Sequence, residues 1–269
     1  MIIDFHTHIF PDKIASKTIE ALSSSASIPP HSDGTLDGLL SRLDEAGVDI
    51  AVNLPVLTKA SQLDSITRFA TQINGKPYTG ARVISFAGIH PDTEDYVGAL
   101  DLVKASGIKG IKVHPDYQGT FIDDEKYVKI LSYANKLDLI TVTHAGLDGA
   151  FIGQEIRCTP VRVLRLLDAL GGYDKLVLAH MGGNELFDKV YSELAGENIY
   201  FDTSYVLSSI GKGMFFDILE KHSCDRILFA TDSPWQNIAT QVDILKSFGI
   251  DKDAENKIFC ENARALLNL

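Results

Sequence analysis

The feature that most constrains the fold is a repeated alternation of short apolar runs with longer amphipathic segments along the 269 residues. Runs rich in Val, Ile and Leu are typical of buried parallel strands, and the segments between them show helical spacing. Leu36, Leu39 and Leu43, for example, lie on one helical face that ends before Gly47, a helix stop signal. The predicted strands are residues 1–5, 50–54, 83–89, 110–113, 139–143, 176–179, 199–203 and 226–231.

The number of these strands predicts a closed barrel. Eight strand–helix units of about 30 residues each occupy about 250 residues, the usual size of a (β/α)8 barrel. An open doubly wound sheet usually carries a Gly-rich phosphate loop after its first strand, whereas residues 4–8 read Asp-Phe-His-Thr-His. We therefore expect an α/β protein with one TIM-barrel domain over residues 1–269, a loop at about 10–34 and a final helix at about 251–267.

The charge balance narrows the range of partners. The chain has 36 acidic and 25 basic residues, a net charge of −11, which argues against a nucleic acid or an anionic membrane surface. No apolar run approaches the ~20 residues that a membrane span needs. The three cysteines are odd in number and widely spaced, so we expect no disulfide framework and a reducing, cytoplasmic location. A small-molecule substrate fits this composition, and the sequence leaves homo-oligomerisation open.

Polar residues follow the predicted strands at the end where barrel enzymes carry their active sites. Residues two apart in a strand face the same way, so His6 and His8 supply half of a divalent metal site. His144 and Asp232, which close other predicted strands, can complete it. An isolated His-x-His is as often a hydrogen-bonded pair, but the combination favours a metal. Mixed imidazole and carboxylate ligands suit Zn²⁺, Mn²⁺, Fe²⁺ or Co²⁺.

Six short motifs carry a family resemblance over the whole chain. They are IDFHTHIFP at 3–11, GIKVHP at 110–115, THAG at 143–146, AHMGG at 179–183, ATDSP at 230–234 and ENARALL at 261–267. Together they resemble the amidohydrolase superfamily, and more narrowly the amidohydrolase-2 group of metal-dependent hydrolases and related decarboxylases.

The resemblance implies one divalent metal ion, Zn²⁺ by preference, bound by His6, His8, His144 and Asp232. It also implies that His180 contacts the metal-bound water or the substrate, and that Asp232 moves the proton from the nucleophile to the leaving group. The expected activity is hydrolysis of a small amide, cyclic amide, ester or lactone by a metal-activated water. Lys112 stands where related binuclear enzymes carry a carbamylated lysine that bridges two metals, but one metal is favoured.

Two other functions stay open. One is a metal-dependent nonoxidative decarboxylase of a small aromatic or unsaturated acid, although the short loops leave little room for the insertions usual in such enzymes. The other is a non-catalytic metal-binding barrel, which we would expect to have lost one of the four ligands, and none is lost.

Other residues are weaker candidates for contact with substrate or a second metal. His90 and His114 both precede proline, so each either lines the pocket or caps its strand. Trp235 follows Asp232 closely enough to lie at a pocket rim and stack on a ring. Arg157 is positioned to grip a carboxylate, although a solvated loop arginine is the commoner case.

Overall fold

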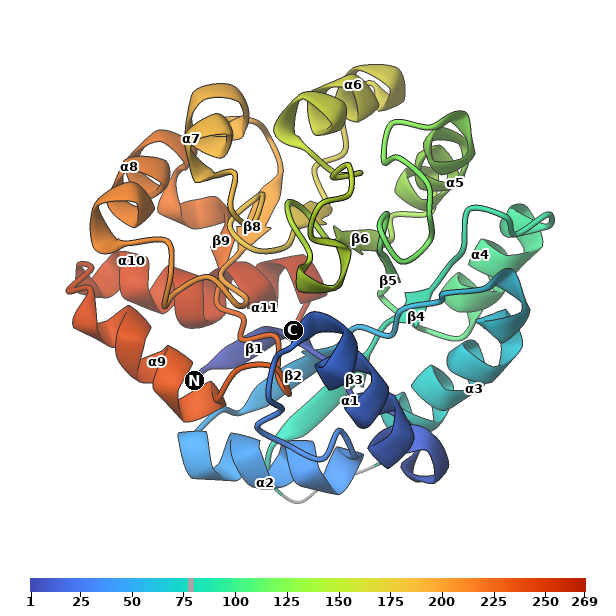
Figure 1. The fold of residues 1–269 in the computed structure, drawn as a ribbon, viewed down its shortest axis with the longest axis horizontal. Helices are drawn as coiled ribbons and strands as arrows, with labels where there is room; N and C mark the ends of the chain where they lie inside the picture. Colours follow the sequence, from blue (N-terminus) through green and yellow to red (C-terminus); the bar gives the residue numbers. More distant parts are fainter. Residues whose placement is uncertain (77–79) are drawn as a thin grey trace.

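The computed structural model describes residues 1–76 and 80–269, in which parallel strands form a barrel surrounded by helices (Figure 1). The strands are β1 (Ile3–Thr7), β2 (Ile50–Asn53), β3 (Arg82–Ser85), β4 (Ala87–Gly88), β5 (Gly110–Val113), β6 (Ile140–Thr143), β7 (Leu176–Leu178), β8 (Tyr200–Asp202) and β9 (Ile227–Leu228).

The strands close into a ring. Strands β1 to β3 pair in one parallel series and β4 to β9 in another, and β3 and β4 are successive parts of one predicted strand. Between β1 and the last strand, the Phe5 amide donates to the Phe229 carbonyl oxygen at 2.9 Å, and the Asp232 amide donates to the His6 carbonyl oxygen at 2.8 Å. Each predicted strand has a counterpart, so the predicted barrel is confirmed.

Helices follow the strands along the chain, and most of them form the outer layer of the barrel. They are α1 (Asp12–Ala26), α2 (Leu36–Ala46), α3 (Leu63–Asn74), α4 (Tyr96–Ala105), α5 (Glu125–Lys136), α6 (Pro160–Leu170), α7 (Phe187–Lys189), α8 (Lys212–His222), α9 (Ile238–Ser247), α10 (Lys252–Asn256) and α11 (Asn262–Leu267). Short 3-10 or π turns are η1 (Ala60–Gln62), η2 (Gly149–Phe151), η3 (Val190–Leu194), η4 (Cys224–Arg226) and η5 (Lys257–Glu261). Among the described residues, no helix is both long and apolar enough to cross a membrane.

Local sequence signals explain why these helices begin and end where they do. Helix α2 starts after Thr35, whose hydroxyl accepts a hydrogen bond from the Gly38 amide at 3.0 Å, and it stops at Gly47 with φ of 66°. Ser, Thr and Asp favour such N-caps, and glycine favours such left-handed C-caps. The helix buries Leu39 and Leu43 against the barrel, as the spacing predicts.

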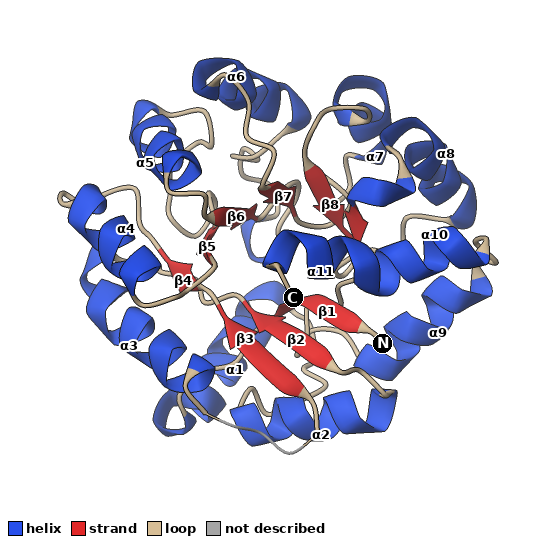
Figure 2. Cartoon of the chain, turned by 180° about the vertical axis from the view of Figure 1, so that it is seen from behind, coloured by secondary structure: helices blue, strands red, loops and turns tan. Residues whose placement is uncertain are grey.

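The inside of the barrel is apolar at the end where the strands begin. Ile3, Ile50 and Ile140, which start their strands, belong to one buried cluster with Ala263 and Leu267 of α11. Figure 2 shows α11 lying across this end of the barrel. Burial of this apolar surface at about 25 cal/mol per Å² stabilises the fold and leaves the other end for polar groups.

Helix α1 occupies much of the segment where we expect a loop. Residues 12–26 are helical, and only the remainder up to residue 34 is irregular. The serines at the end of this segment mask the helical period, but Ala15 and Ile19, one turn apart, are buried. Burial of these two side chains overrides the weak helix propensity of serine. The segment expected as a final helix contains α10, the π-helical turn η5 and α11 in succession.

Candidate metal centre

A β-bulge in β1 aims both histidines of the first strand into the barrel mouth. Ile3 and Phe5 point into the barrel core, so a regular strand would turn His6 outward. The pairing of β1 with β2 shifts register between Asp4 and Thr7. An extra residue in a strand reverses the facing of the residues that follow it, which brings His6 and His8 to the same cavity.

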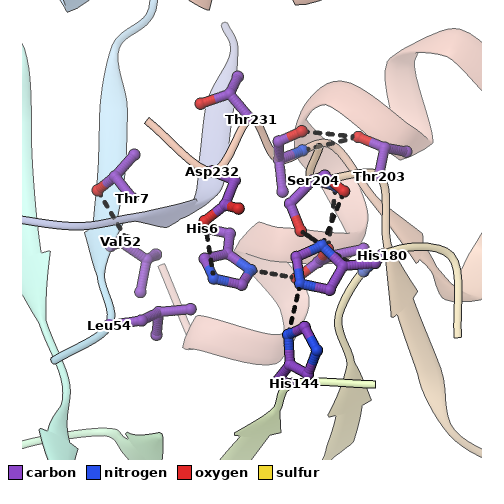
Figure 3. Close-up of polar contacts among 12 residues, drawn as sticks. His6, Thr7, Val52, Leu54, His144, His180, Thr203, Ser204, Thr231 and Asp232 are labelled. Carbon is purple, nitrogen blue, oxygen red and sulfur yellow. Dashed lines mark hydrogen bonds and ion pairs between the residues drawn. The ribbon is translucent and has the colours of Figure 1, made fainter. Parts of the chain in front are cut away.

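Three ligand atoms meet at this point. His6 Nε2 lies 3.2 Å from His8 Nε2, and Asp232 Oδ1 lies 3.5 Å from the first and 3.1 Å from the second. Figure 3 shows His6 and Asp232 facing each other across the end of the barrel. Among the described residues these three form a group with the spacing of metal ligands.

The partners of the two rings fix which nitrogen carries the proton. His6 Nδ1 donates to Asp202 Oδ2 at 2.8 Å, and His8 Nδ1 donates to the Leu54 carbonyl oxygen at 2.8 Å. Both Nε2 atoms therefore carry lone pairs, which face each other beside a carboxylate. The Lys112 ammonium beside His6 Nε2 offsets part of the repulsion among these acceptors, and two inward-facing imidazole nitrogens beside a carboxylate are a donor set that fits a metal ion.

Burial keeps His6 neutral. Desolvation, with help from the nearby Lys112 ammonium, lowers the pKa of the His6 imidazole to about 3. Burial alone would raise the pKa of Asp202, but the hydrogen bonds that it accepts from His6 and the Ser204 hydroxyl help to hold it below its usual range. A neutral imidazole oriented by a buried carboxylate is the arrangement that a metal-binding histidine needs.

Lys112 reaches the same group from β5. Its Nζ lies 3.1 Å from His6 Nε2, and its side chain is 1% exposed. Burial lowers the pKa of the ammonium to about 8, although Asp202 and Asp232 act in the opposite direction. Because the Lys112 nitrogen lies at the edge of the metal group, both roles considered from the sequence stay open: a carbamylated bridge to a second metal, or a positive charge beside a single metal.

A second set of polar residues lies beside the first. His180 Nδ1 donates to the Ser204 carbonyl oxygen at 3.0 Å, which leaves its Nε2 as the acceptor for His144 Nδ1 at 3.0 Å. The His180 ring centroid is 5.6 Å from that of His6. The structure thus leaves His144 outside the group of His6, His8 and Asp232 and places it against His180 (Figure 3).

The far side of His144 carries an orphaned atom. Its Nε2 is buried without a hydrogen-bond partner and lies 3.9 Å from Asp116 Oδ2, which is also unpartnered. His114 stacks on His144 with centroids 4.2 Å apart and planes 10° apart, and its Nε2 contacts Asp148 Oδ2 at 3.3 Å. His114, His144 and Asp148 are a second group with ligand-like spacing. Parallel stacked rings direct their lone pairs along parallel planes, so this group suits a shared ion less well.

Sequence reasoning missed two carboxylates that hold the site together. Asp202 ends β8 and fixes His6, and Asp4 joins β1 to the last strand by accepting from the Thr231 amide at 3.0 Å and hydroxyl at 2.6 Å. Burial raises the pKa of Asp4 to about 7. A carboxylate at the end of an apolar strand was the available signal for Asp202, the same signal that marks Asp232.

A cavity of about 400 Å³ opens above these residues. His6, His8, Lys112, His144, His180 and Asp232 form its polar part, and the candidates His114 and Trp235 also line it. His90 and Arg157 are not among the described residues that line it. His90 Nδ1 instead accepts from the Asp92 amide at 3.1 Å, and Arg157 pairs with Asp116 at 3.4 Å.

Comparisons with known proteins agree with the barrel fold. The Amidohydrolase family profile (Amidohydro_2) matches residues 3–269. The chain therefore belongs to the Amidohydrolase family, as the motifs predict. A search of curated proteins finds no match.

Solved structures share the fold at low sequence identity. A dihydroxybenzoic acid decarboxylase from Polaromonas sp. JS666, with bound manganese and the inhibitor 2-nitroresorcinol, aligns with a TM-score of 0.72 and 19% identity over 100% of this chain and 97% of that chain. A 2,6-dihydroxybenzoate decarboxylase complexed with 2,6-dihydroxybenzoate gives 0.69 and 20% over 100% and 99%. A probable 2-pyrone-4,6-dicarboxylic acid hydrolase from Acinetobacter baumannii, with citric acid bound, gives 0.66 and 20% over 100% and 99%. The fold therefore accommodates both hydrolases and decarboxylases.

Proposed function

We propose that this protein is a metal-dependent hydrolase with one divalent ion held by His6, His8 and Asp232, and with His144 as a fourth ligand, which would require His144 Nδ1 to give up its hydrogen bond to His180. One observation carries the proposal. Zinc–ligand bonds of about 2.0–2.1 Å in a tetrahedron separate neighbouring ligand atoms by about 3.3–3.4 Å. The three separations here are 3.2, 3.5 and 3.1 Å, with both imidazole lone pairs turned inward.

The side chains divide the chemistry between them. When bound, a divalent ion activates water at neutral pH and polarises a carbonyl group. The Asp232 carboxylate, which lies beside both imidazoles, accepts the proton of the attacking water and passes it to the leaving group. His180 lines the cavity, and its Nε2, once released by His144, would orient that water. Lys112 supplies a fixed positive charge beside the acyl oxygen.

Decarboxylation of a small aromatic acid is the second candidate. It is favoured by the position of Lys112, whose ammonium at the polar end of the cavity can hold a substrate carboxylate, while apolar walls surround the remaining volume. A second metal bridged by carbamylated Lys112 is the alternative to a single ion, and it would double the metal content per chain.

Turnover in ¹⁸O-labelled water separates the two reactions. Metal-reconstituted protein is screened against lactones, cyclic amides, esters and aromatic carboxylates, and the products of each active compound are examined by mass spectrometry. Hydrolysis places label in the product. Release of carbon dioxide with no label in the organic product would favour the decarboxylase. Asp232→Asn should abolish turnover, whereas the matched variant Asp148→Asn, which alters a carboxylate of the same cavity outside the metal group, should retain part of it.

A further inference from the structure

The cavity has a polar floor and an apolar outer chamber. All of its metal-type ligands lie at the barrel end, together with Lys112. The outer chamber is walled by Phe10, Ile66 and Phe69 and by helix α1. Figure 1 shows α1 lying across the front of the barrel, on the opposite side from α11 in Figure 2. A bound molecule therefore meets two environments along its length.

Helix α1 contributes one continuous stripe to this chamber. Ile14, Thr18, Leu22 and Ala26 line the cavity at intervals of four residues, so they share one face of the helix. A neighbouring face of the same helix is buried against the protein through Ala15 and Ile19. Because these four side chains line the cavity, they restrict which group at the far end of a ligand fits.

Charge in the cavity is confined to its floor. Among the described lining residues, Lys112 is the only lysine or arginine, and its Nζ is already directed at His6. The carboxylates that line the cavity are Asp148 and Asp232, which would repel a second anionic group. An anion in the outer chamber would lose water without gaining a counter-charge, and the neutral side chains of Thr18, Thr58, Gln62 and Ser65 on the lining would replace only part of its hydration.

We propose that the substrate has a single polar head, a carboxylate or acyl carbonyl, on an apolar ring or branched body that carries no anionic group at its far end. The head lies at the metal group and Lys112, and the body packs against the stripe of α1, which acts as the specificity wall. This assignment rests on the proposed function for the position of the head. It excludes dicarboxylates whose second carboxylate points away from the metal.

Trp235 makes the proposal measurable without turnover. It is the only tryptophan in the chain and it lines the cavity, so its fluorescence reports on occupancy. The probes are 4-isopropylbenzoate and terephthalate, which have similar size and differ in whether the far group is apolar or anionic. We expect saturable binding of both acids, with a dissociation constant for 4-isopropylbenzoate at least about tenfold lower than that for terephthalate. Equal or tighter binding of terephthalate, or no saturable change with either acid, would overturn the proposal.

Charge placed on the stripe should reverse this preference. Leu22→Lys puts an ammonium in the outer chamber, and terephthalate should then bind more tightly than 4-isopropylbenzoate. Ala21→Lys adds the same charge to an exposed position next to it on α1 and should leave the preference unchanged. Ile14 is 50% exposed and also lines the cavity, so Ile14→Lys provides the same test if Leu22→Lys does not fold. Unchanged preference in a folded stripe variant would contradict the role of α1.

Titrations with Mn²⁺, with Zn²⁺ and after chelation separate this proposal from the metal site. If 4-isopropylbenzoate is preferred but the metal changes neither affinity, the specificity wall stands and the head-group position fails. If the metal tightens binding of both acids equally and terephthalate binds as well as 4-isopropylbenzoate, the metal site stands and the substrate class fails.

Discussion

The two ends of the barrel are built from the same strands but have opposite chemistry. Where the strands begin, Ile3, Ile50 and Ile140 pack against α11 in an apolar plug with its side chains almost fully excluded from water. Where they end, imidazoles, carboxylates and Lys112 are largely buried, with His8 partly exposed, and they face one another and a cavity. The first end lowers the free energy of the folded state, and the second holds charges that a stable core would exclude. Stability and function are thus assigned to opposite ends.

The largest effect on stability should come from the apolar end. Leu267 is fully buried in the plug, so Leu267→Ala should lower the free energy of unfolding by about 2–5 kcal/mol. Metal content of the folded fraction should stay the same as in the wild type. Denaturant unfolding and elemental analysis check the two halves of this prediction, and Leu269→Ala, two residues later and 37% exposed, is the control. Loss of metal from the folded variant would contradict the assignment of stability and metal binding to opposite ends of the barrel.

A buried histidine outside the site tests what imidazole burial does by itself. His222 stacks on Phe201 with centroids 3.8 Å apart, and burial lowers its pKa from 6.5 to about 4. Because the unfolded chain binds this proton more readily, stability should fall by up to about 3 kcal/mol as the pH drops from about 7 to 4. At pH values about one unit or more above 6.5, His222 is neutral in both states and its contribution is constant.

The comparison with His222→Asn isolates this titration. The variant removes the imidazole, so the free energy of unfolding should depend less steeply on pH between 6.5 and 4 than in the wild type. Chemical denaturation at several pH values measures the difference. Equal slopes in the two proteins would show that burial at this position does not disfavour the charged ring.

A smaller effect is expected from the carboxylate that orients His6. Asp202→Asn keeps the size of the side chain but removes the charge that fixes the ring, and loss of such a partner typically weakens metal binding by about 10–100-fold. Competition with a chelating dye measures the affinity. Asp148→Asn is the matched variant, because Asp148 contacts His114 and lies outside the His6, His8 and Asp232 group. An equal loss in both variants would argue for general electrostatics instead of ring orientation.

The smallest effects should come from two residues singled out in the sequence. His90 and Arg157 are outside the described lining of the cavity, so His90→Ala and Arg157→Ala should change turnover by less than about threefold. Steady-state kinetics on any active substrate checks this. A loss of turnover above tenfold in Arg157→Ala would mean that the Arg157–Asp116 ion pair helps to position His144, which lies next to Asp116.

The regular parts of the molecule were predictable from sequence because each followed a local rule. Apolar runs of four to seven residues gave the strands, and the polar residue that closes a run marked Asp232 and the site histidines. The two-residue rule correctly put His6 and His8 on one face of the strand. That face points into the barrel only because of the bulge, since Ile3 and Phe5 before it also point inward. No local sequence pattern predicts that bulge.

The remaining features depend on contacts between distant segments. Helix α1 is rich in serine and becomes helical through burial of Ala15 and Ile19, which only the folded barrel offers. Asp202 gains its role from a partner 196 residues away, and the position of His144 beside His180 depends on the left-handed backbone of His180, with φ of 62°. Such pairings are set by the closure of the ring and are not visible in either segment alone.

The metal content of the reconstituted protein tests the central claim most directly. Wild-type protein loaded with Zn²⁺ or Mn²⁺ and dialysed should retain about one ion per chain, as four ligands in one site imply. The double variant His6→Ala/His8→Ala should retain none while its circular dichroism stays that of a folded barrel, because neither ring belongs to the apolar plug. A full complement of bound ion in the folded double variant would contradict the account.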